Sequence, residues 1–109
     1  MTSSYVGRSG AVAARAIDGQ MVILQLATSA LFTLNRVGSR IWELADGRTT
    51  VDQIARRIHE EFEVEAPVAA LDALEFVERL AAQGVLLLSD APVNPDRHSG
   101  GEANATNPR

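Results

Sequence analysis

Apolar positions follow two different spacings along the chain. Over the first third, apolar residues alternate with polar or small ones, which is typical of half-buried strands. This alternation predicts three strands, over residues 11–17, 21–26 and 30–34. The turn dipeptide Asp18-Gly19 separates the first two strands, and a short polar break separates the second from the third. Strands joined by such short connections pair as an antiparallel meander.

From residue 36 onward the apolar positions recur every three or four residues, which predicts helices. Asn35 is a suitable N-cap for a first helix over residues 36–45. Thr50 and Gln53 form a capping box for a second helix. A third helix starts at Pro67 and runs to residue 83. In the first of these helices, Ile41 lies on the core side and Trp42 at its margin, so both are predicted to be structural.

The element order predicts an α+β fold, in which a three-stranded antiparallel β-meander is followed by three α-helices. This order favours a winged helix-turn-helix. The chain has 109 residues, enough for one domain, and its 46% of apolar residues is ordinary for a globular protein. We expect a flexible N-terminus over residues 1–10, a folded domain over residues 11–89, and a disordered tail over residues 90–109. An apolar run at residues 85–88 forms either a final strand or a packed extended end.

The amino-acid composition argues against several classes of function. The chain has no cysteine and two histidines, and its ten basic residues are outnumbered by fourteen acids for a net charge of −4. This charge opposes nonspecific binding to nucleic acid or to an anionic membrane. The carboxylates that cluster near Glu60 lie at a predicted helix end and the following loop, where a solvated charge run is expected rather than a catalytic pair. We therefore expect a cytoplasmic protein that is not an enzyme and uses no cofactor or metal.

A DNA-binding or transcription-regulating winged helix is the alternative function. Several arginines lie on the first two predicted helices or between them, which would suit contacts with phosphates. Between Glu60 and Glu78, however, there are seven acids and no basic residue. A third helix that presents these acids would be repelled by DNA.

The third predicted strand and the third predicted helix are the candidate binding elements. The strand carries no charge and no proline, so nothing protects its edge from pairing. The helix gathers a core-facing arc that includes Phe76, opposite a solvated side marked by Asp72, Glu75 and Arg79. Further apolar residues extend that arc over one flank only. An open edge beside an apolar helix flank is what peptide binding by strand addition requires. The predicted peptide-binding residues are Ala30, Leu31, Phe32, Thr33, Leu34, Ala70, Leu71, Leu74, Glu75 and Glu78.

Two alternatives to this groove follow from the same residues. Residues 85–88 could cover the edge of the third strand, and a neighbouring segment could cover the flank of the third helix. If the groove is open, Glu75 and Glu78 predict a basic residue in the bound peptide, close to its apolar anchors.

The segment LFTLNRVGSRIWEL at residues 31–44 resembles the signature of the PqqD-like family. That signature reads roughly as aromatic-aromatic-x-Leu-Asn-x-x-Gly-x-x-Ile-Trp-x-Leu, and Leu31 departs from it where an aromatic residue is common. Asp46-Gly47, residues 50–52, residues 76–80 and residues 84–86 fall at the spacing of the family. The resemblance extends over residues 12–88, which is most of the predicted domain.

The resemblance implies a small winged-helix module of the kind often called a RiPP recognition element. Such members bind the leader segment of a ribosomally made precursor peptide and pass it to a maturation enzyme. In the family the leader adds a strand beside the third strand and packs on the third helix. The Gly-x-x-Ile-Trp version of the signature resembles stand-alone members of lasso-peptide systems, whose partner is a leader peptidase. The other branch is the pyrroloquinoline-quinone pathway, whose partner is a radical enzyme.

Overall fold

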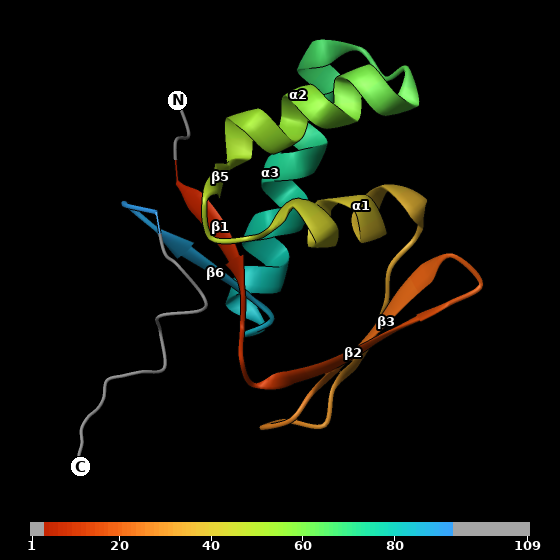
Figure 1. Ribbon diagram of the computed structural model, residues 1–109, viewed down its shortest axis with the longest axis vertical. Helices are drawn as coiled ribbons and strands as arrows, with labels where there is room; N and C mark the ends of the chain where they lie inside the picture. Colours follow the sequence, from red (N-terminus) through yellow and green to blue (C-terminus); the bar gives the residue numbers. More distant parts are fainter. Residues whose placement is uncertain (1–3, 93–109) are drawn as a thin grey trace.

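The computed structural model describes residues 4–92, which form six strands and three helices (Figure 1). The strands are β1 (Tyr5–Arg8), β2 (Val12–Ile17), β3 (Gln20–Gln25), β4 (Leu31–Thr33), β5 (Thr49–Thr50) and β6 (Leu86–Ser89). The helices are α1 (Arg36–Leu44), α2 (Val51–Phe62) and α3 (Ala66–Ala82).

The predicted meander is confirmed as the sheet β2-β3-β4, which we call sheet B. Both pairs of strands are antiparallel, with Ile17 opposite Gln20 and Val22 opposite Thr33. The turn between β2 and β3 holds Asp18 at a φ of 53° and Gly19 at a φ of 81°. Two successive positive φ values match the right-handed twist of a tight hairpin, which explains why the Asp-Gly dipeptide marks this turn.

The N-terminal segment corrects one prediction. Residues 1–10 were expected to be flexible, but Tyr5–Arg8 form β1, the central strand of a second sheet in the order β5-β1-β6, which we call sheet A. Val6 is fully buried there. The strand was missed because it has a single large aliphatic residue and finds both of its partners far along the chain. Residues 1–3 and 93–109 lie outside the described part, and with them most of the predicted disordered tail at 90–109.

The predicted helices form, and their predicted caps are present. The Asn35 side chain accepts a hydrogen bond from the Gly38 N–H at 2.8 Å. The Thr50 hydroxyl accepts from the Gln53 N–H at 3.2 Å, and the Gln53 side chain accepts from the Thr50 N–H at 2.9 Å. The capping box is thus complete. The meander followed by three helices is confirmed, whereas the assignment to the winged helix-turn-helix class stays a prediction.

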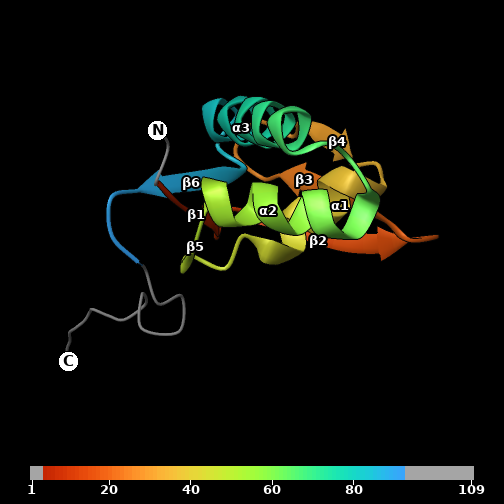
Figure 2. The ribbon, with the colours of Figure 1, turned by 90° about the horizontal axis from the view of Figure 1, so that it is seen from above.

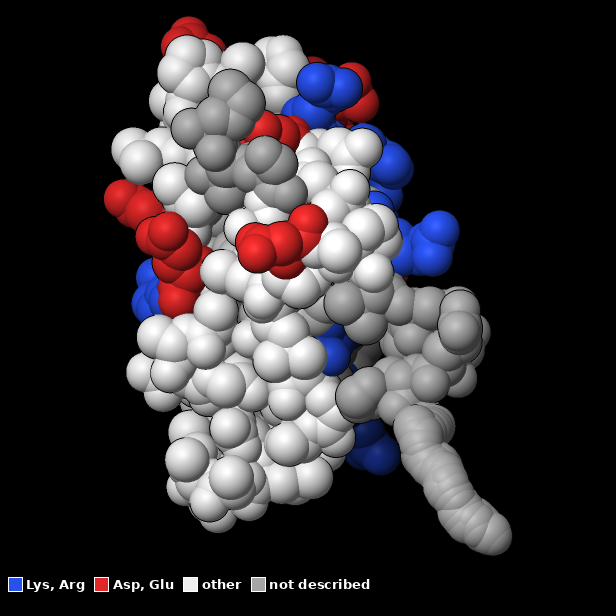
Figure 3. All heavy atoms as spheres, turned by 90° about the vertical axis from the view of Figure 1, so that its left-hand side faces the viewer, with Lys and Arg blue, Asp and Glu red and all other residues white. Residues whose placement is uncertain are grey.

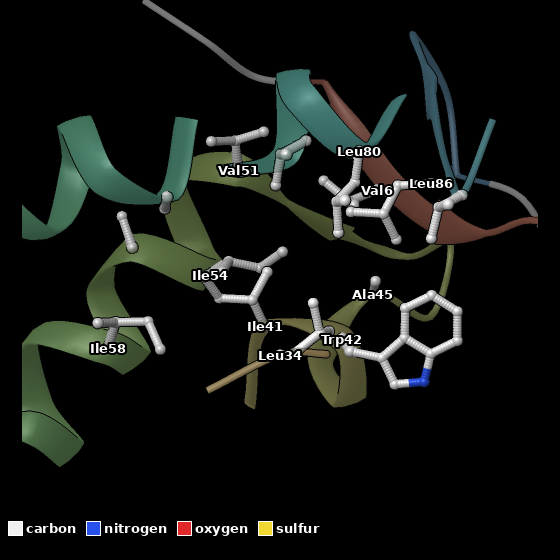
Figure 4. Packing of buried hydrophobic residues seen from close by; sticks show 14 of the residues in the cluster. Val6, Leu34, Ile41, Trp42, Ala45, Val51, Ile54, Ile58, Leu80 and Leu86 are labelled. Carbon is white, nitrogen blue, oxygen red and sulfur yellow. The ribbon is translucent and has the colours of Figure 1, made fainter. Parts of the chain in front are cut away.

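The core lies between the three helices and sheet A (Figure 4). Ile41 is 1% exposed and Trp42 is 5% exposed, which confirms that both are buried. In Figure 4 the Trp42 indole stands at one end of the cluster, as expected for a residue at the margin of a helix face. The Arg8 guanidinium lies 5.8 Å from the centre of the Trp42 ring, a cation–π contact that links β1 to α1. Sheet B packs on this core through β3, whose Ile23 is fully buried, and Figure 2 shows α2 and α3 lying side by side.

Candidate functional site: a strand edge beside a helix

The first component of the site is the open edge of β4. Within residues 4–92, β3 is the only strand that pairs with β4, so the other side of β4 is free. The run at residues 85–88, which could have covered this edge, pairs with β1 in sheet A instead. Leu31–Thr33 carries no charge, and such an edge can accept another strand.

The hydrogen bonds at the two ends of β4 identify the backbone groups that face this edge. The Gln25 N–H donates to the Ala30 carbonyl at 2.9 Å, and the Leu34 N–H donates to the Met21 carbonyl at 2.8 Å. In an antiparallel ladder, hydrogen-bonded pairs alternate with non-bonded pairs. Phe32, midway between the two ends, therefore directs its backbone groups toward β3. The N–H and C=O groups of Leu31 and Thr33 point to the open edge.

The side chains of β4 alternate between the two faces of sheet B. Leu34 is 5% exposed and Phe32 is half-buried against the core. Leu31 is 66% exposed, the highest value among the exposed large apolar residues of the described chain, and Thr33 is exposed as well. The open edge thus has one face packed on the protein and one face presented to solvent.

The second component is an open hollow of about 280 Å³ at the end of β4. Residues of α1 and its N-cap lie on one side of it, and residues of α3 on the other. Ile58 of α2 and Val64 of the loop after α2 contribute apolar surface. Its remaining lining residues are Asn35, Val37, Gly38, Ile41, Asp72, Glu75, Phe76 and Arg79.

Gly38 and Phe76 bring the two sides of this hollow together. A Cβ atom placed on Gly38 would lie 2.8 Å from Cε1 and 3.1 Å from Cζ of the Phe76 ring, so the ring occupies the space that any larger residue would need. The Arg79 guanidinium covers the Phe76 ring at 5.8 Å from its centre. The aromatic ring is thereby held between the α1 backbone and a cation, half-buried at the edge of the hollow.

The α3 residues that were predicted to bind do not all lie on this side of the helix. Glu75 lines the hollow, whereas Ala70, Leu71, Leu74 and Glu78 do not. At 100° per residue, Leu74 lies about 160° around the helix from Phe76. Leu74 is half-buried against the core, and Leu71 is 56% exposed near the outer crest of the helix.

Of the ten residues that line the hollow, only Glu75 is among the predicted peptide-binding residues. Phe76 had been placed in the core arc, and Asp72 and Arg79 on the solvated side. One sequence signal was available, because a glycine inside a helix costs about 1 kcal/mol relative to alanine and usually marks a close approach. Gly38 is such a glycine.

The charges around the site stabilise the helices and oppose nucleic-acid binding. The Arg40 guanidinium of α1 donates to the Glu61 carboxylate of α2 at 2.8 and 3.0 Å, and this hydrogen bonding holds the pKa of the Glu61 carboxyl below its usual value. Asp72, Glu75 and Glu78 are all exposed on α3. The face shown in Figure 3 is largely uncharged, with acidic side chains at its left margin and in its centre and basic ones mostly along its right margin. A broad basic patch is the expected footprint of a DNA-binding protein, whereas the charged groups in the upper centre of this face are acidic.

Neither a metal-binding cluster nor a membrane-spanning helix is present in the described part of the chain. Among residues 4–92, no three His, Asp or Glu side chains are grouped closely enough to hold a metal ion. None of the three helices is both long enough and apolar enough to span a bilayer.

Comparison with known proteins decides the family. The family model for coenzyme PQQ synthesis protein D (PqqD) matches residues 20–86, which is more than half of the chain. The chain belongs to the PqqD family. The match begins at β3 and ends at the first residue of β6, and it includes β4, the three helices and every residue that lines the hollow.

Two solved structures resemble this PqqD-family chain. One is TbiB1 in complex with the TbiA(beta) leader peptide, with 35% identity, a TM-score of 0.67, and coverage of 73% of this chain and 93% of that one. The other is lasso peptide synthetase B1 complexed with the leader peptide, with 25% identity, a TM-score of 0.66, and coverage of 76% and 98%. No match was found among the curated proteins.

Proposed function

We propose that this PqqD-family chain binds the leader segment of a ribosomally made precursor peptide by adding it as a strand to β4. The observation that carries this proposal is the open, uncharged edge of β4. Its Leu31 and Thr33 backbone groups face outward, beside a hollow lined by α3. A peptide strand there gains backbone hydrogen bonds from β4 and side-chain contacts from the hollow.

The two structural relatives support the leader as the occupant. Both contain a leader peptide, and the alignments span almost the whole of those chains. The open hollow adds the selective part of the site, since Phe76 offers an aromatic ring and Glu75 an exposed carboxylate next to it. Two carboxylates, of Asp72 and Glu75, line the hollow with the single cation of Arg79, and this acidic excess favours a basic residue in the leader near its apolar anchors.

We further propose that the chain presents the bound leader to a maturation enzyme. A separate leader peptidase of a lasso-peptide system is the favoured partner, because the structural relative at 25% identity is a lasso peptide synthetase B1. The reading frames next to the gene test this choice. A short precursor frame beside a peptidase and a cyclase supports the lasso assignment, whereas a radical enzyme with an iron–sulfur cluster supports the pyrroloquinoline-quinone branch.

A proline scan of the β4 edge tests the binding mode. The probe is a synthetic leader peptide encoded by the short precursor frame that neighbours the gene, titrated calorimetrically. Thr33→Pro removes an N–H that points to the open edge and leaves the bonds between β3 and β4 in place, so the fold should survive. A lost backbone hydrogen bond is worth about 0.5–1.5 kcal/mol, and the ring also obstructs pairing, so we expect the Kd to rise about tenfold or more.

Thr33→Ala is the matched control, because it shortens the same side chain and keeps the N–H. It should bind within about threefold of wild type, since Thr33 is exposed and its side chain makes no hydrogen bond in the described structure. Equal Kd values for Thr33→Pro and Thr33→Ala would refute strand addition as the binding mode. Amide chemical shifts that move at Arg56 and Arg57 rather than at β4 would place the peptide on the outer surface of α2 instead.

A further inference from the structure

Two buried polar side chains connect sheet B to the helices. Gln25 and Ser39 are each 7% exposed, and they are the buried polar residues of the described chain. Sheet B otherwise packs on the helices mainly through β3 against α1. Burial of an amide or a hydroxyl is unfavourable unless its hydrogen bonds are satisfied, so the partners of these two groups define what they do.

Gln25 joins the end of β3 to the end of α3. Its Nε2 donates to the carbonyl of Gln83, the C-cap of α3, at 3.3 Å. Its Oε1 accepts from the Ala27 N–H at 2.7 Å, which fixes the start of the turn into β4. A Cβ on Gly84 would lie 2.7 Å from Nε2, so only glycine leaves room for this amide. We call this arrangement the Gln25 clasp.

Ser39 makes the equivalent connection at the other end of β3. Its hydroxyl accepts from the Met21 N–H at 2.9 Å and donates to the Leu34 carbonyl at 3.2 Å. Met21 lies opposite Leu34, and Gln25 lies opposite Ala30. The two buried side chains therefore fix β3 opposite the two ends of β4, one to α1 and the other to α3.

We infer that Gln25 is a positioning residue for leader binding, because its clasp sets the distance between the open edge of β4 and α3. The inference rests on the proposed function, which gives this distance its purpose. Position 25 lies on the same face of β3 as the fully buried Ile23, where an apolar residue would be the ordinary choice. An amide there supplies directional bonds that select one arrangement of sheet and helix.

A site assembled in advance binds more tightly than one that must be ordered on binding. If the clasp is lost, sheet B still packs through β3 and α1, but its angle to α3 is no longer determined at the Gln83 end. The leader must then fix the position of β4 relative to α3 when it binds. The expected signature is weaker binding together with a wider distribution of distances between sheet B and the helices.

The test combines binding with a distance measurement. Gln25→Leu removes both hydrogen bonds of the clasp at nearly constant volume, and Gln20→Leu is the matched control on the same strand at an exposed position. Because the chain has no cysteine, nitroxide labels can be attached at Ala14→Cys on β2 and Glu60→Cys on α2, both exposed. The binding probe is the synthetic leader peptide from the neighbouring precursor frame.

We expect Gln25→Leu to broaden the distribution of spin–spin distances and to raise the leader Kd about tenfold, with no change for Gln20→Leu. A narrow distribution in Gln25→Leu would overturn the inference, whether or not stability falls. If Gln25→Leu does not fold, Gln25→Glu keeps the acceptor for the Ala27 N–H, replaces the donor to Gln83 by an oxygen that the Gln83 carbonyl repels, and should show the same two effects. A wild type that binds no leader would overturn the proposed function, and the distance distributions would still decide whether Gln25 positions sheet B.

Discussion

Gly38→Ala is the substitution that most directly probes the contact between α1 and α3. The new methyl carbon would lie 2.8 Å from Cε1 of Phe76, whereas ordinary contacts begin near 3.4 Å. The ring must therefore retreat by about 0.6 Å from α1, which changes the wall of the hollow. Because the contact is with the far end of a half-buried side chain, the ring can move without unfolding the helix.

The expected magnitudes follow from two opposing effects. Alanine is favoured over glycine in a helix by about 1 kcal/mol, and overpacking costs about 1–3 kcal/mol. The free energy of unfolding should therefore fall by about 0–2 kcal/mol, measured by urea denaturation. An aromatic contact is worth about 0.5–1.5 kcal/mol, so displacement of the ring should raise the leader Kd by about threefold to tenfold.

Two further variants isolate the cause. Gly10→Ala is the matched control, because a Cβ at Gly10 meets nothing within 4 Å, and it should bind as wild type does. Phe76→Leu shortens the side chain that the new methyl group meets. In a double-mutant cycle, the loss from Gly38→Ala should shrink when Phe76→Leu is already present. A Gly38→Ala variant that is about 1 kcal/mol more stable than wild type and binds leader equally well would refute the close contact.

Three other predictions concern stability, pH and charge. Trp42→Ala should lower the free energy of unfolding by about 3–5 kcal/mol, because the side chain is 5% exposed, and an unchanged melting temperature by circular dichroism would contradict this. The pKa of Glu61 is lowered by its hydrogen bond to Arg40, so this carboxylate stabilises the fold above about pH 4.5 and loses that effect as the pH falls. In Glu61→Gln, the urea concentration at the midpoint of unfolding should therefore depend less on pH between pH 6 and 3. Glu75→Gln should reduce the salt dependence of leader association more than Glu78→Gln, measured by stopped flow, because only Glu75 lines the hollow; equal slopes for the two variants would contradict the placement.

The elements that could be predicted from the sequence are those whose cause is local. Asp18-Gly19 specifies a tight hairpin through its own φ values, and Thr50 with Gln53 caps α2 within four residues. Periodicity then assigned the buried face of α1 correctly, because burial repeats about every 3.6 residues in a helix. Each of these signals lies within one element and does not depend on where the element packs.

Sheet A could not be predicted in the same way. Its central strand β1 has β5 and β6 as partners, which begin more than forty and almost eighty residues later in the chain. The segment around Val6 is short and contains two glycines within Gly7–Gly10, so its own propensity for a strand is weak. What makes it a strand is the pairing on both sides and the burial of Val6 against the core, and both are tertiary effects.

The side of α3 that lines the hollow could be identified only with the same kind of tertiary information. Periodicity shows which residues of a helix share a face, but the rotation of that helix relative to a strand edge is set by packing. Leu71 and Leu74 were favoured because an apolar flank suggests a groove, yet the side that faces α1 is a mixed surface of Asp72, Phe76 and Arg79. Gly38 indicates which side of α3 faces α1, because a glycine inside α1 implies a bulky neighbour at van der Waals distance, and Phe76 is the aromatic residue of α3. In the sequence, a close approach between two helices is indicated only by the small residue, here Gly38. The bulky residue that it contacts, here Phe76, can be identified only from the fold.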